Sequence, residues 1–185
     1  MELENKNPKI YIISGKARSG KDTTADIIEK YYSNKKVFKL SYSYYLKDFA
    51  KRITGWDGSD DTKPREFLQQ LGIELIKTKI DEHFLINRLC DDIKVFSYFY
   101  DVIIITDARL VDEIEIPKNL YPNATVIRIN RNIDNNLTTN EKKHLTEIGL
   151  DNYNKYDYII ENNKTIDELN KKVIEIIRKE DLNEK

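Results

Sequence analysis

The stretch that decides the fold is GKARSGKDT, Gly15 to Thr23, which directly follows the apolar run Ile10 to Ile13. A glycine, four further residues and then Gly-Lys is the pattern of a phosphate-binding P-loop between a strand and a helix. In such a loop, backbone N–H groups and the helix N-terminus surround the phosphates of a nucleotide, and the lysine neutralises their outer oxygens. The sequence therefore predicts that Lys21 and its neighbours bind a nucleoside triphosphate.

One position departs from the usual pattern, which continues with Ser or Thr after the lysine. Here Asp22 follows Lys21, and Thr23 comes next. A carboxylate is a good oxygen ligand for Mg²⁺, so we expect Asp22 to hold the metal directly or through water, and Thr23 to reach a phosphate. The alternative is a P-loop whose metal site is broken.

Composition excludes several classes of protein. The 185 residues fit a single domain spanning 1–185. The net charge of −1 lacks the basic surplus of most nucleic-acid binders, so we expect no nucleic acid as a partner. The single Cys90 excludes an internal disulfide or a cysteine metal cluster. Because there is no signal-peptide pattern and no long apolar run, we expect a cytoplasmic protein without a membrane partner, either a monomer or a homodimer.

Five apolar runs predict strands covered on both faces, because they are rich in Val and Ile. They are Ile10 to Ser14, Val37 to Leu40, Val102 to Thr106, Ala124 to Ile129 and Tyr156 to Ile160. Helical patterns lie at Thr24 to Tyr32, Tyr45 to Ile53, Pro64 to Ile80 and Asp167 to Lys179. The alternation predicts an α/β fold, a five-stranded parallel sheet with helices on both faces. Ligands of such sheets bind beyond the carboxyl ends of the strands.

Two segments are too long to be plain connections. Residues 42–100 separate the second and third strands, and we expect a substrate-binding excursion there. Residues 131–148 are polar and rich in turn formers, which is typical of a mobile lid. An ordinary solvated loop is the alternative for this second segment.

Asp107 ends the third apolar run, in the stretch ITDAR. P-loop enzymes hold Mg²⁺ with an acidic residue at the tip of an apolar strand, so we expect Asp107 to be the second carboxylate beside the metal, after Asp22. Such a residue can instead cap the following helix.

Arginine is scarce among the 31 basic residues, and most arginines stand where phosphates are expected. The planar guanidinium matches phosphate oxygens in a bidentate way. The candidates are Arg18 in the P-loop, Arg65 in the excursion, Arg109 after the strand-end Asp, and Arg128 and Arg131 before the lid. We expect Arg52, Arg88 and Arg178 to form surface ion pairs.

Four blocks carry a resemblance to a known family: SGKARSGKDTTADII, REFLQQLGIELI, ITDARLVDEIE and KHLTEIGLDNYNKYDYIIENN. They resemble the phage-type deoxynucleoside monophosphate kinases and their bacterial relatives. They also resemble the animal phosphomevalonate kinases, so the resemblance does not choose the phosphate acceptor. It implies a three-layer P-loop kinase fold.

The resemblance also implies roles for individual residues. ATP phosphates and Mg²⁺ would be held by Gly15, Lys16, Arg18, Ser19, Gly20, Lys21, Asp22 and Thr23, with Asn162 and Asn163 near the adenine. Arg65, Gln69 and Gln70 would face the acceptor, although both glutamines could equally lie on a solvated helix face. Asp107 and Arg109 would lie between donor and acceptor. Arg131, His144, Thr146 and Glu147 would belong to the lid, where His144 could be a surface residue instead.

The chemistry that these residues favour is transfer of the ATP γ-phosphoryl group to a deoxynucleoside 5′-monophosphate, giving ADP and a diphosphate. Tyr42, Tyr44, Tyr45 and the two glutamines offer stacking surface and amides for a base, whereas residues 42–100 do not obviously provide the dense set of cations that a small diacid needs. One alternative is the same chemistry on a phosphorylated metabolite such as phosphomevalonate. The other is a P-loop module that binds nucleotide without transferring phosphate.

Overall fold

A computed structural model describes residues 3–132 and 148–183. Its five strands form one parallel sheet in the order β2-β3-β1-β4-β5. The strands are β1 (Lys9–Ser14), β2 (Val37–Leu40), β3 (Val102–Ala108), β4 (Thr125–Asn130) and β5 (Tyr158–Glu161). Each predicted strand is confirmed to within two residues at either end.

The four predicted helical patterns are also confirmed, and two further helices appear. The first helix begins at Lys21 rather than Thr24, because the P-loop leads directly into it. The helices are α1 (Lys21–Tyr31), α2 (Tyr42–Thr54), α3 (Arg65–Gln69), the π-helix η1 (Gln70–Ile80), α4 (Phe84–Phe96), α5 (Asp112–Leu120) and α8 (Ile166–Asn183). The sequence did not single out α4 and α5. None of the helices in the described ranges is both long and apolar enough to cross a membrane.

Helix α5 was hard to predict because Pro117 lies inside it. A proline within a helix removes the hydrogen bond to the carbonyl four residues earlier, which here belongs to Glu113. The Tyr42 hydroxyl instead donates to that carbonyl at 2.8 Å. A side chain from α2 thus satisfies the acceptor that the proline leaves open.

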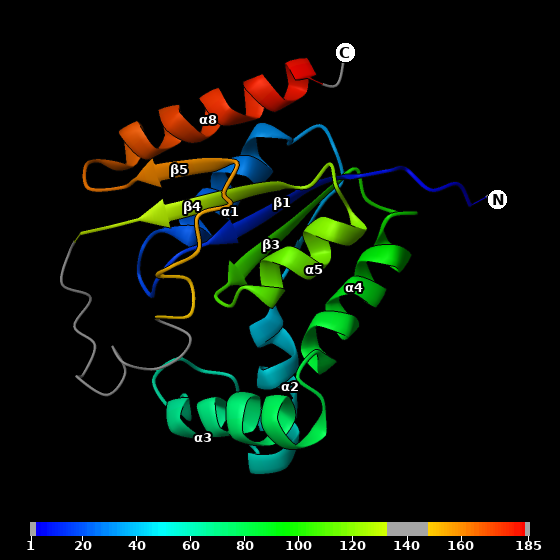
Figure 1. Ribbon diagram of the computed structural model, residues 1–185, viewed down its shortest axis with the longest axis vertical. Coiled ribbons are helices and arrows are strands. Elements are labelled where there is room, and N and C mark those ends of the chain that lie inside the picture. The colour runs from blue at the N-terminus through cyan, green and yellow to red at the C-terminus, as the bar shows by residue number, and fades with distance from the viewer. Residues whose placement is uncertain (1–2, 133–147, 184–185) are drawn as a thin grey trace.

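Helices cover both faces of the sheet, which confirms the three-layer architecture (Figure 1). On one face, Ile10 and Ile12 of β1 pack with side chains of α2, α4 and α5. On the other face, Tyr11 and Ile13 pack with α1 and α8. Because neighbouring residues of a strand point to opposite faces, β1 is buried on both sides and holds the P-loop firmly at its carboxyl end.

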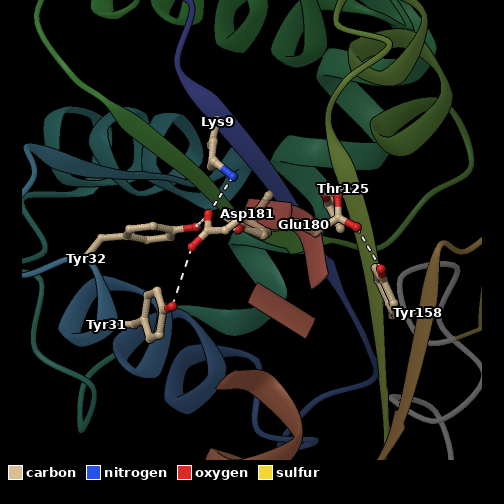
Figure 2. A network of polar contacts seen from close by, with 8 residues as sticks. Lys9, Tyr31, Tyr32, Thr125, Tyr158, Glu180 and Asp181 are labelled. Atoms are coloured by element: carbon tan, nitrogen blue, oxygen red, sulfur yellow. Dashed lines mark hydrogen bonds and ion pairs between the residues drawn. The ribbon is translucent and has the colours of Figure 1, made fainter. Parts of the chain in front are cut away.

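The C-terminal helix α8 is tied to the sheet by two acidic residues near its end (Figure 2). Asp181 forms an ion pair with Lys9 at 2.6 Å and accepts a hydrogen bond from the Tyr32 hydroxyl at 2.8 Å. Glu180 accepts hydrogen bonds from Thr125 Oγ1 at 2.8 Å and from the Tyr158 hydroxyl at 2.7 Å. These contacts join α8 to β1, α1, β4 and β5 far from the P-loop.

Candidate active site

The P-loop connects β1 to α1, and close contacts require both of its glycines. A Cβ atom at Gly15 would lie 2.5 Å from Ser19 Oγ and 2.7 Å from Ile129 O. Gly20 has a φ of +105°, and a Cβ atom there would lie 2.5 Å from Asn162 Nδ2. No other residue fits such positions without displacing its neighbours. The backbone therefore stays open to an approaching phosphate.

Asn162 supports the P-loop through a hydrogen bond to its backbone. Its buried side chain donates from Nδ2 to Ser19 O at 2.8 Å. Asn163 is exposed, and its Oδ1 accepts a hydrogen bond from Asn132 N at 2.7 Å. The expected contact of these two asparagines with adenine stays a prediction.

The P-loop lysine and serine are buried inside the loop. Lys21 is 6% exposed, and its Nζ donates to Lys16 O at 2.8 Å. The hydroxyl of Ser19 is buried without a hydrogen-bond partner. A buried hydroxyl in this state is costly unless a ligand or water completes it, so the loop fits a phosphate oxygen.

Asp107 lies at the tip of β3, where its carboxylate joins the strand to a helix. Its two oxygens accept from the backbone of α2, from Tyr42 N at 2.8 Å and from Ser43 N at 3.0 Å. The residue thus binds the start of α2, the first helix after β2, whereas the alternative expectation was a cap on the helix that follows β3. A carboxylate oxygen can accept more than one hydrogen bond, and Asp107 lines a cavity.

Glu113 fixes the turn that presents Arg109. Its Oε2 accepts from Arg109 N at 2.7 Å and from Leu110 N at 3.0 Å. Burial raises the pKa of the Glu113 carboxyl to about 7, against the lowering effect of these hydrogen bonds. Glu113 was not among the residues predicted for the site, although its place four positions after Arg109 was a usable signal.

A cavity of about 620 Å³ brings donor and acceptor candidates together. From the P-loop and strand tip it is lined by Arg18, Lys21, Asp22, Asp107 and Arg109, and from the excursion by Tyr42, Arg65 and Gln69. Gln70 is exposed and does not line it. Tyr44 is exposed as well, and the Tyr45 hydroxyl donates to Asp92 at 2.6 Å instead of facing the cavity.

The excursion supplies more cations than the sequence led us to expect. Lys47, Lys63 and Lys77 line the cavity together with Arg65. Partial burial lowers the pKa of the Lys63 amine, and the charges of Lys47 and Arg65 lower it further, although Asp60 opposes them. The expectation that residues 42–100 lack a dense set of cations was therefore wrong. The reason is that these lysines come from separate elements, α2, the loop before α3, and η1.

The remaining candidates lie elsewhere. Lys16 and Arg131 line a second cavity on the other side of the loop. Thr23 is half-buried in the first turn of α1 and does not line the 620 Å³ cavity. His144, Thr146 and Glu147, with nearly all of the predicted lid, lie outside the described residues.

The P-loop lysine shares one cavity with an aspartate at a strand end and with an excursion that carries an arginine. This arrangement defines the class of P-loop kinases. Solved structures agree with this fold. The chain superposes on APS kinase from Mycobacterium tuberculosis with a TM-score of 0.54 and 12% identity, covering 92% of this chain and 97% of that one. Shikimate kinase from Bacteroides thetaiotaomicron gives 0.54 and 14%, covering 92% and 98%. Shikimate kinase from Aquifex aeolicus gives 0.51 and 18%, covering 94% and 98%.

The family is narrower than this class. The family model for deoxynucleotide monophosphate kinase matches residues 46–173, and the chain belongs to that family. A comparison with curated proteins finds no match.

Proposed function

We propose that the protein transfers the γ-phosphoryl group of ATP to a deoxynucleoside 5′-monophosphate. One observation carries the proposal: Lys21 and Asp22 of the P-loop line the same cavity as Arg65 and Gln69 of the excursion. A donor phosphate on the loop and an acceptor phosphate on the excursion would therefore meet across Asp107 and Arg109. The family match supports a monophosphate as the acceptor.

The side chains in the cavity suit a reaction that needs positioning more than proton transfer. An acceptor phosphate carries roughly −1.5 to −2 charge at neutral pH, so its oxygen attacks without a general base. Lys21 would neutralise the outer phosphate of the donor, Arg109 the group in transfer, and Arg65 the acceptor. Holding two anions in line is the main contribution that such residues make to the rate.

Asp22 and Asp107 are the residues that would hold Mg²⁺. The fit is reasonable, because Mg²⁺ in kinases is bound by one or two carboxylates together with substrate phosphates and water. Both carboxylates line the cavity, and no group of three or more metal-binding side chains occurs in the described part of the chain. When bound, the ion would supply positive charge to the donor phosphates.

A second candidate acceptor is a small phosphorylated metabolite. The cluster of Lys47, Lys63, Arg65 and Lys77 favours it, because four cations exceed what a single monophosphate requires. Gln69 favours the nucleotide, because a side-chain amide can pair with the edge of a base. The family match also favours the nucleotide.

A coupled assay of ADP release with a panel of acceptors tests the proposal. We expect turnover with at least one deoxynucleoside monophosphate and little with ribonucleotides or phosphomevalonate.

Lys21→Ala should lower the rate by several orders of magnitude, because the donor charge is uncompensated, whereas Lys30→Ala, on the exposed end of the same helix, should not. Turnover with phosphomevalonate alone would favour the second candidate, and no turnover with any acceptor would contradict both.

A further inference from the structure

A second cavity, of about 380 Å³, lies on the other side of the P-loop from the site described above. It shares no lining residue with the 620 Å³ cavity. Its walls are the carboxyl end of β4, the segment before β5 and Lys16 of the P-loop. The lining residues are Lys16, Arg128, Ile129, Asn130, Arg131, Asn132, Leu150, Asp151, Tyr153, Tyr156 and Ile159.

Arg128 is the unusual member of this wall. It is 8% exposed, and it pairs in register with Ser14, the residue just before the P-loop. Its Nε donates to Asn130 Oδ1 at 3.2 Å, and its guanidinium carbon lies 5.7 Å from the centroid of the Tyr156 ring. Within residues 3–132 and 148–183, no carboxylate pairs with it. A buried charge without a counter-charge is strongly unfavourable.

The neighbours of Arg128 hold it in this position. Asn130 uses its amide nitrogen to donate to Glu161 Oε1 at 2.9 Å, so its oxygen is directed toward the guanidinium. Tyr156 covers one face of the guanidinium. Arg128 lines the cavity, and its terminal nitrogens donate no hydrogen bond to another described residue.

The other polar groups around the cavity also suit an anion. Three cations line the cavity, since Lys16 and Arg131 join Arg128. The carboxylate among the lining residues is Asp151, which pairs with Lys16 at 2.7 Å. The hydroxyls of Ser14 and Tyr156 are buried and interact with each other, without a hydrogen bond of good geometry to any partner. A phosphate can accept from hydroxyls and from a guanidinium fork at the same time.

We propose that this second cavity binds a phosphate group, with Arg128 as its anchor. The phosphate could be free inorganic phosphate or could belong to a separate phosphorylated ligand. In both cases it differs from the γ-phosphate of the donor, which the proposed function places in the 620 Å³ cavity. In either case Arg128 acts in addition to Arg65, which belongs to the acceptor cavity.

Equilibrium dialysis with labelled inorganic phosphate, with the P-loop saturated by ADP, tests the proposal without relying on turnover. We expect wild-type protein to bind two phosphates, one in each cavity. Arg128→Met should weaken one of them by about 10- to 150-fold, which is the effect of losing a charge-assisted hydrogen bond. Arg65→Met should weaken the other, and Arg178→Met, an exposed arginine of α8, should weaken neither.

Unchanged phosphate binding in Arg128→Met would overturn the proposal. If that variant does not fold, as judged by its thermal melt, Arg128→Lys replaces it, because a lysine keeps the charge but loses the fork. A native melt with about tenfold weaker binding supports the proposal, and native affinity overturns it. An Arg65→Met variant that still binds two phosphates would contradict the acceptor assignment alone.

Replacing ADP by a non-hydrolysable ATP analogue checks that this site is separate from the position of the γ-phosphate. We expect the phosphate anchored by Arg128 to bind in the presence of the analogue as well. Exclusion of that phosphate by the analogue would overturn the proposal of a separate site.

Discussion

At the scale of single residues, binding of the acceptor in the 620 Å³ cavity depends on which cations can form two hydrogen bonds to a phosphate. Arg65 is the arginine among the four excursion cations that line the cavity, and the other three are lysines. A lysine is a point charge on a flexible stem, whereas an arginine presents a planar fork. Arg65 is therefore the residue whose replacement separates charge from geometry.

Arg65→Lys should raise the KM for the monophosphate by roughly 10- to 150-fold and change the KM for ATP far less. Steady-state kinetics with each substrate varied in turn measures both values. Arg52→Lys is the matched control, since Arg52 is exposed and pairs with Asp48 at 2.8 Å on the surface of α2. Equal losses for both substrates would point to a structural role, and a loss for ATP alone would mean that the two sites are exchanged.

Glu113 links the stability of the turn after β3 to pH. Because burial raises the pKa of its carboxyl to about 7 from an ordinary 4.5, the folded protein holds a proton there that the unfolded chain releases. The stability from this proton is fully present below about pH 4.5 and is lost as the pH rises through 7.

Glu113→Gln should remove this loss, because an amide oxygen can accept from the same two backbone N–H groups without ionising. Between pH 4.5 and 7.5, we expect the difference in unfolding free energy between variant and wild type to shift by about 1 to 3 kcal/mol in favour of the variant. Urea denaturation across this range measures the difference, with the exposed Glu175→Gln as control. Parallel curves for wild type and Glu113→Gln would show that Glu113 is ionised throughout.

At the scale of elements, the P-loop depends on a residue far away in the sequence. The loop leaves β1 and enters α1, yet its Ser19 carbonyl is held by Asn162, which follows β5. The excursion shows a related feature, because its helix changes from α to π geometry at Gln70. Such changes are frequent at functional sites, and this one lies where Gln69 lines the cavity and the next residue, Gln70, is exposed.

Asn162→Ala should destabilise the fold by about 1 to 2 kcal/mol and raise the KM for ATP, because a buried carbonyl of the P-loop loses its donor. Asn163→Ala, one position on and exposed, is the control and should change stability by less than about 0.5 kcal/mol. Thermal melts and ATP kinetics measure the two effects. If both variants raise the KM for ATP without loss of stability, contact with adenine explains them better than support of the loop.

At the scale of the whole molecule, α8 closes one face of the sheet and is anchored at the opposite end from the active site (Figures 1 and 2). Burial alone would raise the pKa of Asp181, but the hydrogen bonds from Lys9 and Tyr32 outweigh it and lower the pKa. Asp181 therefore stabilises the fold above its ordinary pKa near 4, and this contribution is lost as the pH falls through the lower folded value.

Asp181→Asn should cost about 0.5 to 2 kcal/mol of unfolding free energy at pH 7, with less effect at pH 3. Urea denaturation at the two pH values measures it, and Glu175→Gln, in an exposed pair with Lys179, should stay within about 0.5 kcal/mol of wild type. A loss that is equal at both pH values would mean that packing of the side chain, and not its charge, holds α8.

Local patterns in the sequence were enough to predict the P-loop, the five strands and the helices beside them. The reason is that phosphate binding by a loop and burial of a strand both depend on residues that are adjacent in the chain. Two helices were missed for local reasons as well, since Pro117 hides α5 and no cap marks the start of α4.

Only the tertiary structure decided which distant side chains share a cavity. Lys47, Lys63 and Lys77 look like surface residues in the sequence, and they meet because α2, the following loop and η1 fold around one space. Arg128 was predicted to meet a phosphate before the lid, but only the fold shows that it is buried between β1 and Tyr156, with no carboxylate of the described residues as its partner. A charge acts on its neighbours in space, so no pattern along the chain could have predicted these groupings.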